Sequence, residues 1–206
     1  MNFLTKILFV ALMIFGTEAA PSETKDVNCH HIPKTALNTT CCMAPEVISK
    51  SVIKQCEEDA EGQNYNEVMK ECVTTACVIE KSDFMKDKEF SQELLLSHIA
   101  TSLGDQPKWN DLIGSAVKTC IKKGMEQHEK IIKMFTKSPF GINADECNPV
   151  PMYVANCVDA EILVNCPEKS WNDEKSCNSW RRYLSKCDIF ENIPTIDLKV
   201  ESANLE

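Results

Sequence analysis

Residues 147–177 decide the fold, and they read CNPVPMYVANCVDAEILVNCPEKSWNDEKSC. Asn148 and Pro149 are suited to open a helix, because proline is favoured in a first helical turn. One face of this helix carries the side chains of Val154, Cys157, Val158 and Ile162. Pro167 stops the helix after Cys166, since proline lacks the N–H that the next turn needs. One helix therefore brings a cysteine to the core and ends on another.

Residues 1–19 have the pattern of a secretory signal peptide. A lone Lys6 precedes an apolar run over residues 7–15, and Thr17 and Ala19 stand three and one residues before the expected cleavage point. A membrane-spanning helix needs roughly 20 apolar residues, and no other run approaches that length. We therefore expect a secreted, extracellular protein without membrane insertion. Residues 20–206 should form a single domain with an N-terminal arm and a C-terminal extension.

The charge balance limits the partners. The chain of 206 residues holds 31 Asp and Glu against 22 Lys and Arg, for a net charge of −9. Nucleic acids and anionic membranes are bound through clustered lysines and arginines. We therefore expect no nucleic acid partner.

Twelve cysteines, all after the leader, predict up to six disulfides, because they are even in number and the compartment oxidises thiols. Buried free thiols are the alternative. Cys29, Cys41 and Cys42 would fasten the polar arm to the domain. Asn38 begins an Asn-Thr-Thr triplet in this arm and is a candidate glycosylation site.

Helical periodicity covers most of the remaining chain. The first helix would begin at Pro45 and end near Gly62, and the second would run from about 66 to 80. The others are a helix capped by Ser91 and stopped by Gly104, one from Asn110 or Asp111 to Gly124, one over 125–135, the helix ending at Cys166, and a last one carrying Cys177 and Cys187. No alternating β pattern of any length occurs. The sequence thus predicts an all-α fold, with about six to eight helices around a hydrophobic core or pocket.

Few residues suggest chemistry. His30 and His31 lie near cysteines, and zinc binds both residue types, but the cysteines lack C-x2-C pairs, so we expect no metal. Asp159 and Glu161 could form a carboxylate pair, although a solvated helix face is the commoner explanation. A nucleophile elbow, a phosphate-binding loop and a His-Glu-x-x-His motif are all missing from the sequence. We therefore expect no enzyme, no catalytic residue and no cofactor.

The cysteine spacing resembles that of insect odorant-binding proteins. The six places of the general family pattern would be taken, in order, by Cys56, Cys72, Cys77, Cys120, Cys157 and Cys166. The extra Cys147, the Pro167 that follows Cys166, and Cys41-Cys42 before Pro45 look like the cysteine-enlarged Plus-C subgroup. In one departure, Cys72 and Cys77 are five residues apart, where the family usually has four.

This resemblance implies three bridges: Cys56–Cys77, Cys72–Cys157 and Cys120–Cys166. The pairing of the other six stays open: Cys29, Cys41, Cys42, Cys147, Cys177 and Cys187. If Cys177 and Cys187 lie on one helix, they are about 15 Å apart along its axis, which is too far for a bridge. We expect the leftover bridges mainly to tie the arm to the C-terminal half.

The resemblance also implies a function: an extracellular carrier that binds odorants or other semiochemicals in an internal pocket, without chemistry. Apolar stripes look alike in a solid core and around a pocket, so the residues alone do not choose between them. Two alternatives stay open: a scavenger of lipids or amines in haemolymph or saliva, and a disulfide-rich protein-interaction module without a pocket. The expected partner is a small hydrophobic ligand. A membrane receptor is an open second partner, and monomer and homodimer both remain open.

The candidate pocket residues lie on the second, third, fourth and sixth predicted helices. They are Met69, Val73, Leu95, Ile99, Leu112, Ala116, Val117, Val154, Val158 and Ile162. For each of them, plain core packing is the alternative. An Ala116→Trp change should fill such a pocket. The apolar residues of the tail, 188–206, predict that part of it covers the domain as a lid, the alternative being a disordered acidic end.

Overall fold

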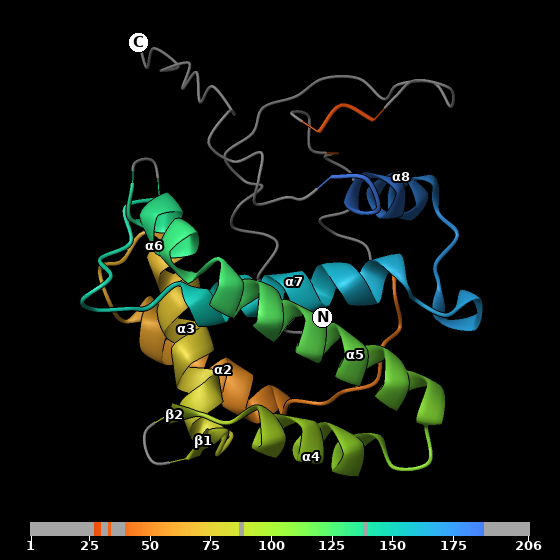
Figure 1. Ribbon diagram of the computed structural model, residues 1–206, viewed down its shortest axis with the longest axis horizontal. Helices are drawn as coiled ribbons and strands as arrows, with labels where there is room; N and C mark the ends of the chain where they lie inside the picture. The colour runs from red at the N-terminus through yellow and green to blue at the C-terminus, as the bar shows by residue number, and fades with distance from the viewer. Residues whose placement is uncertain (1–26, 30–32, 34–39, 87–88, 138–139, 188–206) are drawn as a thin grey trace.

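The protein is all-α, as the periodicity predicts (Figure 1). The computed structural model describes residues 27–29, 33, 40–86, 89–137 and 140–187; the leader, Asn38 and the tail 188–206 lie outside these ranges. The α-helices are α2 (Lys50–Glu61), α3 (Glu67–Lys81), α4 (Gln92–Leu103), α5 (Pro107–Glu126), α6 (His128–Thr136), α7 (Val150–Val164) and α8 (Lys175–Leu184). A 3-10 turn, η2 (Glu168–Ser170), precedes α8. The periodicity missed a two-residue antiparallel ladder, β1 (Met85–Lys86) with β2 (Glu89–Phe90).

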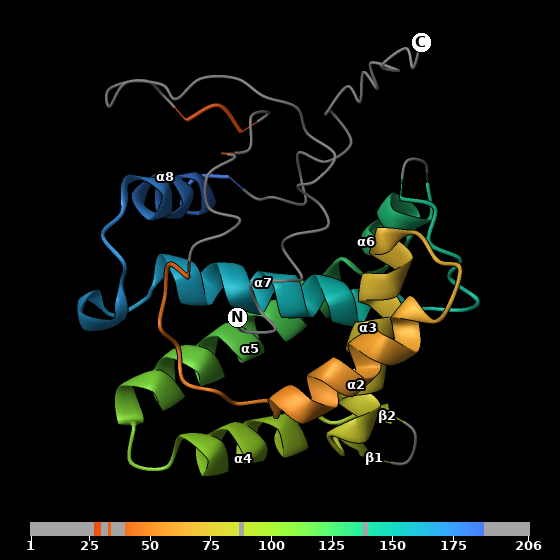
Figure 2. The ribbon, with the colours of Figure 1, turned by 180° about the vertical axis from the view of Figure 1, so that it is seen from behind.

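The helices stack around α5 and α7, which share the most extensive contact (Figures 1 and 2). In both views α4 lies beyond α5, and α8 lies on the other side of α7. α2 and α3 pair with each other and stand at one end of this stack. Within the described ranges, no helix is both long enough and apolar enough to cross a bilayer.

Two predicted helix starts are confirmed by their caps. The side chain of Asn66 accepts a hydrogen bond from the Met69 N–H at 2.8 Å and begins α3. Ser91 accepts one from the Leu94 N–H at 3.3 Å and begins α4. Such caps satisfy N–H groups that have no partner inside a helix, which is why these starts could be read from sequence.

The predicted start of the first helix at Pro45 is wrong, because α2 begins five residues later, at Lys50. The carbonyl of Val47 accepts a hydrogen bond from the Nε2 of His98, at 2.9 Å, in place of a helical N–H. Further back, the N–H of Met43 donates to the carbonyl of Ser170 at 2.8 Å. Tertiary contacts therefore hold this segment in a non-helical path.

The helix containing Gly124 also differs from its prediction. It begins at Pro107 rather than at Asn110 or Asp111, and it continues through Gly124 instead of ending there. A Cβ atom at position 124 would lie 2.7 Å from a methyl group of Val154 on α7. Gly124 is thus a contact point that lets α5 approach α7 closely. The next helix begins at His128 rather than at 125, and α8 ends three residues before Cys187.

All twelve cysteines lie in the described ranges and form six disulfides. The bridges are Cys29–Cys187, Cys41–Cys177, Cys42–Cys166, Cys56–Cys77, Cys72–Cys147 and Cys120–Cys157. The prediction of Cys56–Cys77 is confirmed. So is the prediction that the leftover bridges mainly tie the arm to the C-terminal half.

The predicted bridges Cys72–Cys157 and Cys120–Cys166 are wrong. Cys147 lies just before α7 and beside α3, where the Cys72 sulfur is 3.4 Å from the Asn148 carbonyl oxygen. Cys157 is seven residues beyond the first residue of α7, about 10 Å along its axis, and meets Cys120 on α5. The family order of pairing, first with third, second with fifth and fourth with sixth, is retained if Cys147 and Cys157 take the last two places.

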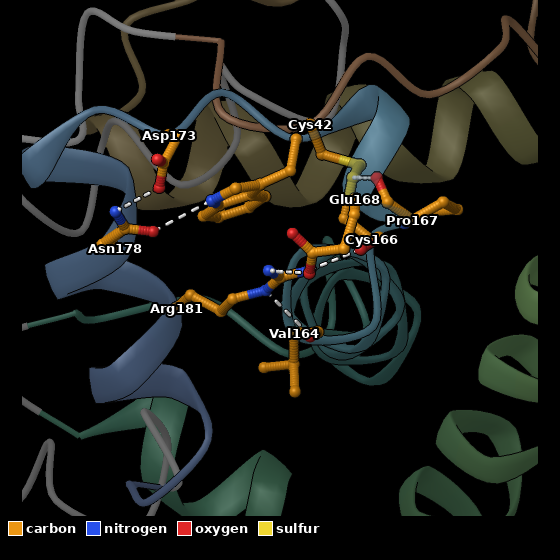
Figure 3. A network of polar contacts seen from close by, with 9 residues as sticks. Cys42, Val164, Cys166, Pro167, Glu168, Asp173, Asn178 and Arg181 are labelled. Carbon is orange, nitrogen blue, oxygen red and sulfur yellow. Dashed lines mark hydrogen bonds and ion pairs between the residues drawn. A yellow bond between two sulfur atoms is a disulfide. The ribbon is translucent and has the colours of Figure 1, made fainter.

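The C-terminal end of α7 is held by Arg181 of α8 (Figure 3). Its guanidinium donates through Nε to the carbonyl of Val164 at 3.1 Å and through a second nitrogen to the carbonyl of Cys166. A third nitrogen pairs with a carboxylate oxygen of Glu168, also at 3.1 Å. These bonds satisfy carbonyl groups at and just beyond the helix end, where helical N–H donors run out.

Trp171 extends this contact toward the arm. The guanidinium of Arg181 lies 4.0 Å from the centre of its ring, a cation–π contact. The indole N–H donates to the side-chain oxygen of Asn178 at 3.0 Å, and Trp171 forms a backbone bridge with Cys42. The arm, the end of α7 and α8 are therefore joined by polar contacts as well as by disulfides.

Candidate ligand-binding cavity

A cavity of about 450 Å³ lies among α3, α4, α5 and α7. These are the four helices on which the sequence predicts a pocket wall. The short segment before α2, the first turn of α2, Phe84 and Phe90 at the β1–β2 ladder, and Asn148 before α7 also contribute to the lining. The volume falls in the range of small-molecule sites, which is about 300–1,000 Å³.

Six of the ten candidate residues line this cavity: Leu95, Ile99, Val117, Val154, Val158 and Ile162. They come from the apolar stripes of α4, α5 and α7. Ile99 and Ile162 are buried, whereas Val154 and Val158 are half-buried. The helical stripes therefore located much of the wall, although they could not show that a space lay behind it.

The other four candidates, Met69, Val73, Leu112 and Ala116, are not among the residues that line this cavity. Met69 and Val73 belong to a separate apolar cluster with Phe135 and Met152. Ala116 is buried one turn before Cys120, whose disulfide to Cys157 places that face of α5 against α7. A tryptophan at position 116 would therefore crowd the α5–α7 contact and would not fill the cavity.

Sequence reasoning missed the lining residues that lie outside its chosen stripes. Ala44, Pro45, Glu46, Val47 and Ile48 all contribute, and we call this segment the strap. Further lining residues are Ile53, Val78, Phe84, Ile113 and Ile121. Ile113 and Ile121 follow the same stripe of α5 as Val117 and could have been included by their spacing. The sequence pattern assigned residues 45–48 of the strap to the first turn of a helix, so it did not identify the strap as a separate part of the wall.

Four polar or charged side chains contribute to the lining: Glu46, Lys50, Thr75 and Asn148. The Thr75 hydroxyl donates to the Glu71 carbonyl at 2.9 Å, and the Asn148 side-chain oxygen accepts from the Val150 N–H at 3.0 Å. At the exposed rim, Glu46 and Lys50 form an ion pair at 3.0 Å, and the hydrogen bond from Lys50 lowers the pKa of Glu46. These groups already have partners within the protein, so the cavity suits a largely apolar occupant.

Asp159 does not lie on a solvated face, contrary to the sequence interpretation. Its side chain is 2% exposed, and neither carboxyl oxygen has a hydrogen-bond partner in the described structure. Nor does it pair with Glu161, which is partly exposed and lies 3.5 Å from the ammonium nitrogen of Lys123. The solvated-face interpretation therefore fits Glu161 but not Asp159.

The acidic neighbour of Asp159 is Glu71 of α3. Glu71 is also buried, and one of its carboxyl oxygens accepts a hydrogen bond from the Asn156 amide at 2.6 Å. Burial raises the pKa of Glu71 to about 8, although the Asn156 hydrogen bond opposes this effect. Burial, and secondly the charge of Glu71, raise the pKa of Asp159 well above its usual value. Both carboxyls therefore favour the protonated form at neutral pH.

No metal centre is formed by the residues described here, which contain no cluster of three or more His, Cys, Asp or Glu side chains able to hold an ion. His30 and His31 fall outside the described ranges. The disulfides remove every cysteine from consideration as a thiolate ligand.

The helical array, the apolar cavity and the cysteine pairs define the class of an insect odorant-binding protein. The family model described as AgamOBP47-like matches residues 45–183, and the chain belongs to this family of insect odorant-binding proteins. Its six disulfides fit the Plus-C subgroup.

Two mosquito proteins are similar over most of their length. General odorant-binding protein 68 of Anopheles gambiae is 27% identical over 164 residues, which cover 79% of this chain and 76% of that protein. Odorant-binding protein 47 of the same species is 23% identical over 162 residues, covering 76% and 70%.

Proposed function

We propose that this protein is a secreted carrier that binds small hydrophobic molecules, odorants or other semiochemicals, in the cavity among α3, α4, α5 and α7, without chemistry. The observation that carries the proposal is the cavity itself, with apolar side chains over most of its wall. Family membership supports it, since the two relatives are named as odorant-binding proteins. The signal-peptide pattern of residues 1–19 supports secretion.

Burial of apolar surface would drive binding, at about 25 cal/mol for each Å² removed from water. The disulfides would help to keep the walls in place when the cavity is empty. Cys120–Cys157 joins two wall helices, and Cys42–Cys166 anchors the chain just before the strap. A preformed cavity reduces the ordering cost of binding.

The test is uptake of an environment-sensitive fluorescent dye by the disulfide-bonded protein, residues 20–206. The proposal predicts saturable uptake of about one dye per chain, displaced by small apolar molecules. Val117→Trp would place an indole in the cavity and should abolish uptake while helicity is retained. Leu112→Trp is the matched control, because Leu112 is on the same helix, half-buried and outside the lining.

Uptake by the Val117→Trp variant equal to that of the wild type would contradict the proposed site. A complete lack of uptake by the wild type would instead favour a protein-interaction module. The same dye, displaced by panels of volatile compounds, lipids and amines, separates an odour carrier from a scavenger in haemolymph or saliva. A membrane receptor as a further partner, and the choice between monomer and homodimer, are left to binding and sedimentation measurements.

A further inference from the structure

The strap crosses the cavity without regular secondary structure. Figure 2 shows it as the orange segment that leaves the end of α7, passes α5 and α4, and reaches the start of α2. Its N-terminal side is anchored by the Cys42–Cys166 disulfide and by the bond from the Met43 N–H to Ser170. At its other side, the Glu46 carboxylate accepts the N–H of Lys50 at 3.1 Å. The strap is therefore tied at both ends.

Between these ends, one side chain of α4 ties the strap to the body of the protein. The Nε2 of His98 lies 2.9 Å from the Val47 carbonyl oxygen. Among the hydrogen bonds of the described residues, this bond alone joins the strap backbone to another helix. The His98 ring also packs edge-on against Phe84, with the ring centres 5.2 Å apart. Val47 and Phe84 both line the cavity, so His98 connects two parts of its wall.

The cavity reaches the surface beside the strap. Glu46 of the strap and Lys50, two residues after it, are exposed and also line the cavity. A ligand entering or leaving here would pass the edge of the strap. Movement of the strap away from α4 would widen that opening, and the bond from His98 opposes this movement.

We propose that His98 is a positioning residue that holds the strap against α4 and thereby limits the rate of ligand escape. This inference rests on the proposed carrier function. His98 acts through Val47 and Phe84, since it is not itself among the lining residues. The Nε2 must carry the proton to donate to the carbonyl, and this can occur in both the neutral and the charged ring.

Two substitutions separate the hydrogen bond from the ring contact. His98→Phe retains an aromatic ring beside Phe84 but has no donor for the Val47 carbonyl. His98→Gln replaces the ring with an amide that can still donate. Thr101→Val is the control, because Thr101 is on the same helix and its hydroxyl bonds only to the Ser97 carbonyl, one turn away.

Stopped-flow displacement of the bound dye should give an off-rate about fivefold faster for His98→Phe, the effect of one net hydrogen bond of typical strength. His98→Gln should restore most of the wild-type rate, and Thr101→Val should match the wild type. Equal off-rates for the wild type and His98→Phe would overturn the proposal. A general loss of rigidity would instead accelerate release in both His98 variants, and that result would also overturn it.

The carbonyl carbon of Val47, observed by nuclear magnetic resonance, tests the same contact without a ligand, because its chemical shift depends on the hydrogen bond that this carbonyl accepts. A changed shift in His98→Phe, with the wild-type shift largely retained in His98→Gln, supports the tie, and an unchanged shift in His98→Phe refutes it. This measurement remains decisive if the wild type takes up no dye, which would contradict only the carrier function. If His98→Phe does not fold, His98→Leu is measured in its place, because it lacks the donor in a smaller side chain.

Discussion

Replacing Glu71 with glutamine should remove much of the pH dependence of the stability of this protein. Glu71 is buried between α3 and α7, and burial raises its pKa from the usual 4.5 to about 8. A glutamine has nearly the same shape and can still accept the hydrogen bond that Asn156 donates at 2.6 Å. The substitution therefore removes a proton-binding site while retaining the packing and the polar contact.

The direction of the pH dependence follows from the number of protons that the folded and the unfolded chain bind. Below pH 4.5 the carboxyl is protonated in both the folded and the unfolded chain, so its contribution to stability is fully present. Between pH 4.5 and 8 the folded protein keeps the proton and the unfolded chain loses it, so the free energy of unfolding falls as the pH rises. At about 1.4 kcal/mol for each pH unit, the loss by pH 7 is about 3 kcal/mol.

The assay is denaturant unfolding of the oxidised protein at pH 5 and pH 7, followed by circular dichroism. Wild-type stability should fall between these values by roughly 2 kcal/mol more than that of Glu71→Gln, and the variant should be the more stable protein at pH 7. Asp159 titrates in both proteins, so the comparison isolates Glu71 and its repulsion with Asp159. Glu161→Gln is the control, and its partly exposed pair with Lys123 should be worth less than about 1 kcal/mol. Equal pH dependence in the wild type and Glu71→Gln would refute the reasoning.

Two further substitutions test how α7 is held. Gly124→Ala should lower the free energy of unfolding by about 1–3 kcal/mol, because the new Cβ would lie 2.7 Å from a methyl group of Val154. A melting temperature equal to that of the wild type would show that α5 and α7 can move apart at this point without a loss of stability. Arg181→Met should cost about 2 kcal/mol, since it keeps much of the side-chain length but loses the donors to Val164 and Cys166. Arg182→Met, at an exposed position on the same helix, is the control, and equal melting temperatures for the two variants would contradict the role given to Arg181.

Much of the fold could be predicted from signals between residues close in sequence, such as helix caps and apolar periodicity. Asn66 and Ser91 cap their helices because short polar side chains satisfy free N–H groups, and this depends only on neighbouring residues. The non-helical path of the strap could not be predicted from neighbouring residues, because the hydrogen bond that holds Val47 comes from His98, 51 positions away. The predicted helix end at Gly124 was wrong for a similar reason. A glycine that ends a helix and a glycine that lets a neighbouring helix approach look the same in sequence.

The candidate site was predictable to the extent that it follows helical stripes. Val117, Val154 and Val158 line the cavity as expected, whereas Ala116 faces the contact with α7. A difference of one position on α5 separates a wall residue from a core residue. The burial of Asp159 depends on the packing of α7 against its neighbours, which spacing along one helix could not show.

The order of the disulfides along the chain has a consequence for biosynthesis. Cys56 and Cys77 are 21 residues apart and can meet early, whereas Cys29, Cys41 and Cys42 have partners 158, 136 and 124 residues further on. At about 5–20 residues per second, a ribosome needs roughly 6 to 32 seconds to make the intervening chain. On the proposed secretory route, the arm thiols would enter an oxidising compartment during that interval, before their partners exist and while other cysteines are already present. Correct maturation therefore calls for a disulfide isomerase, or for an arm that stays unpaired until α8 has left the ribosome.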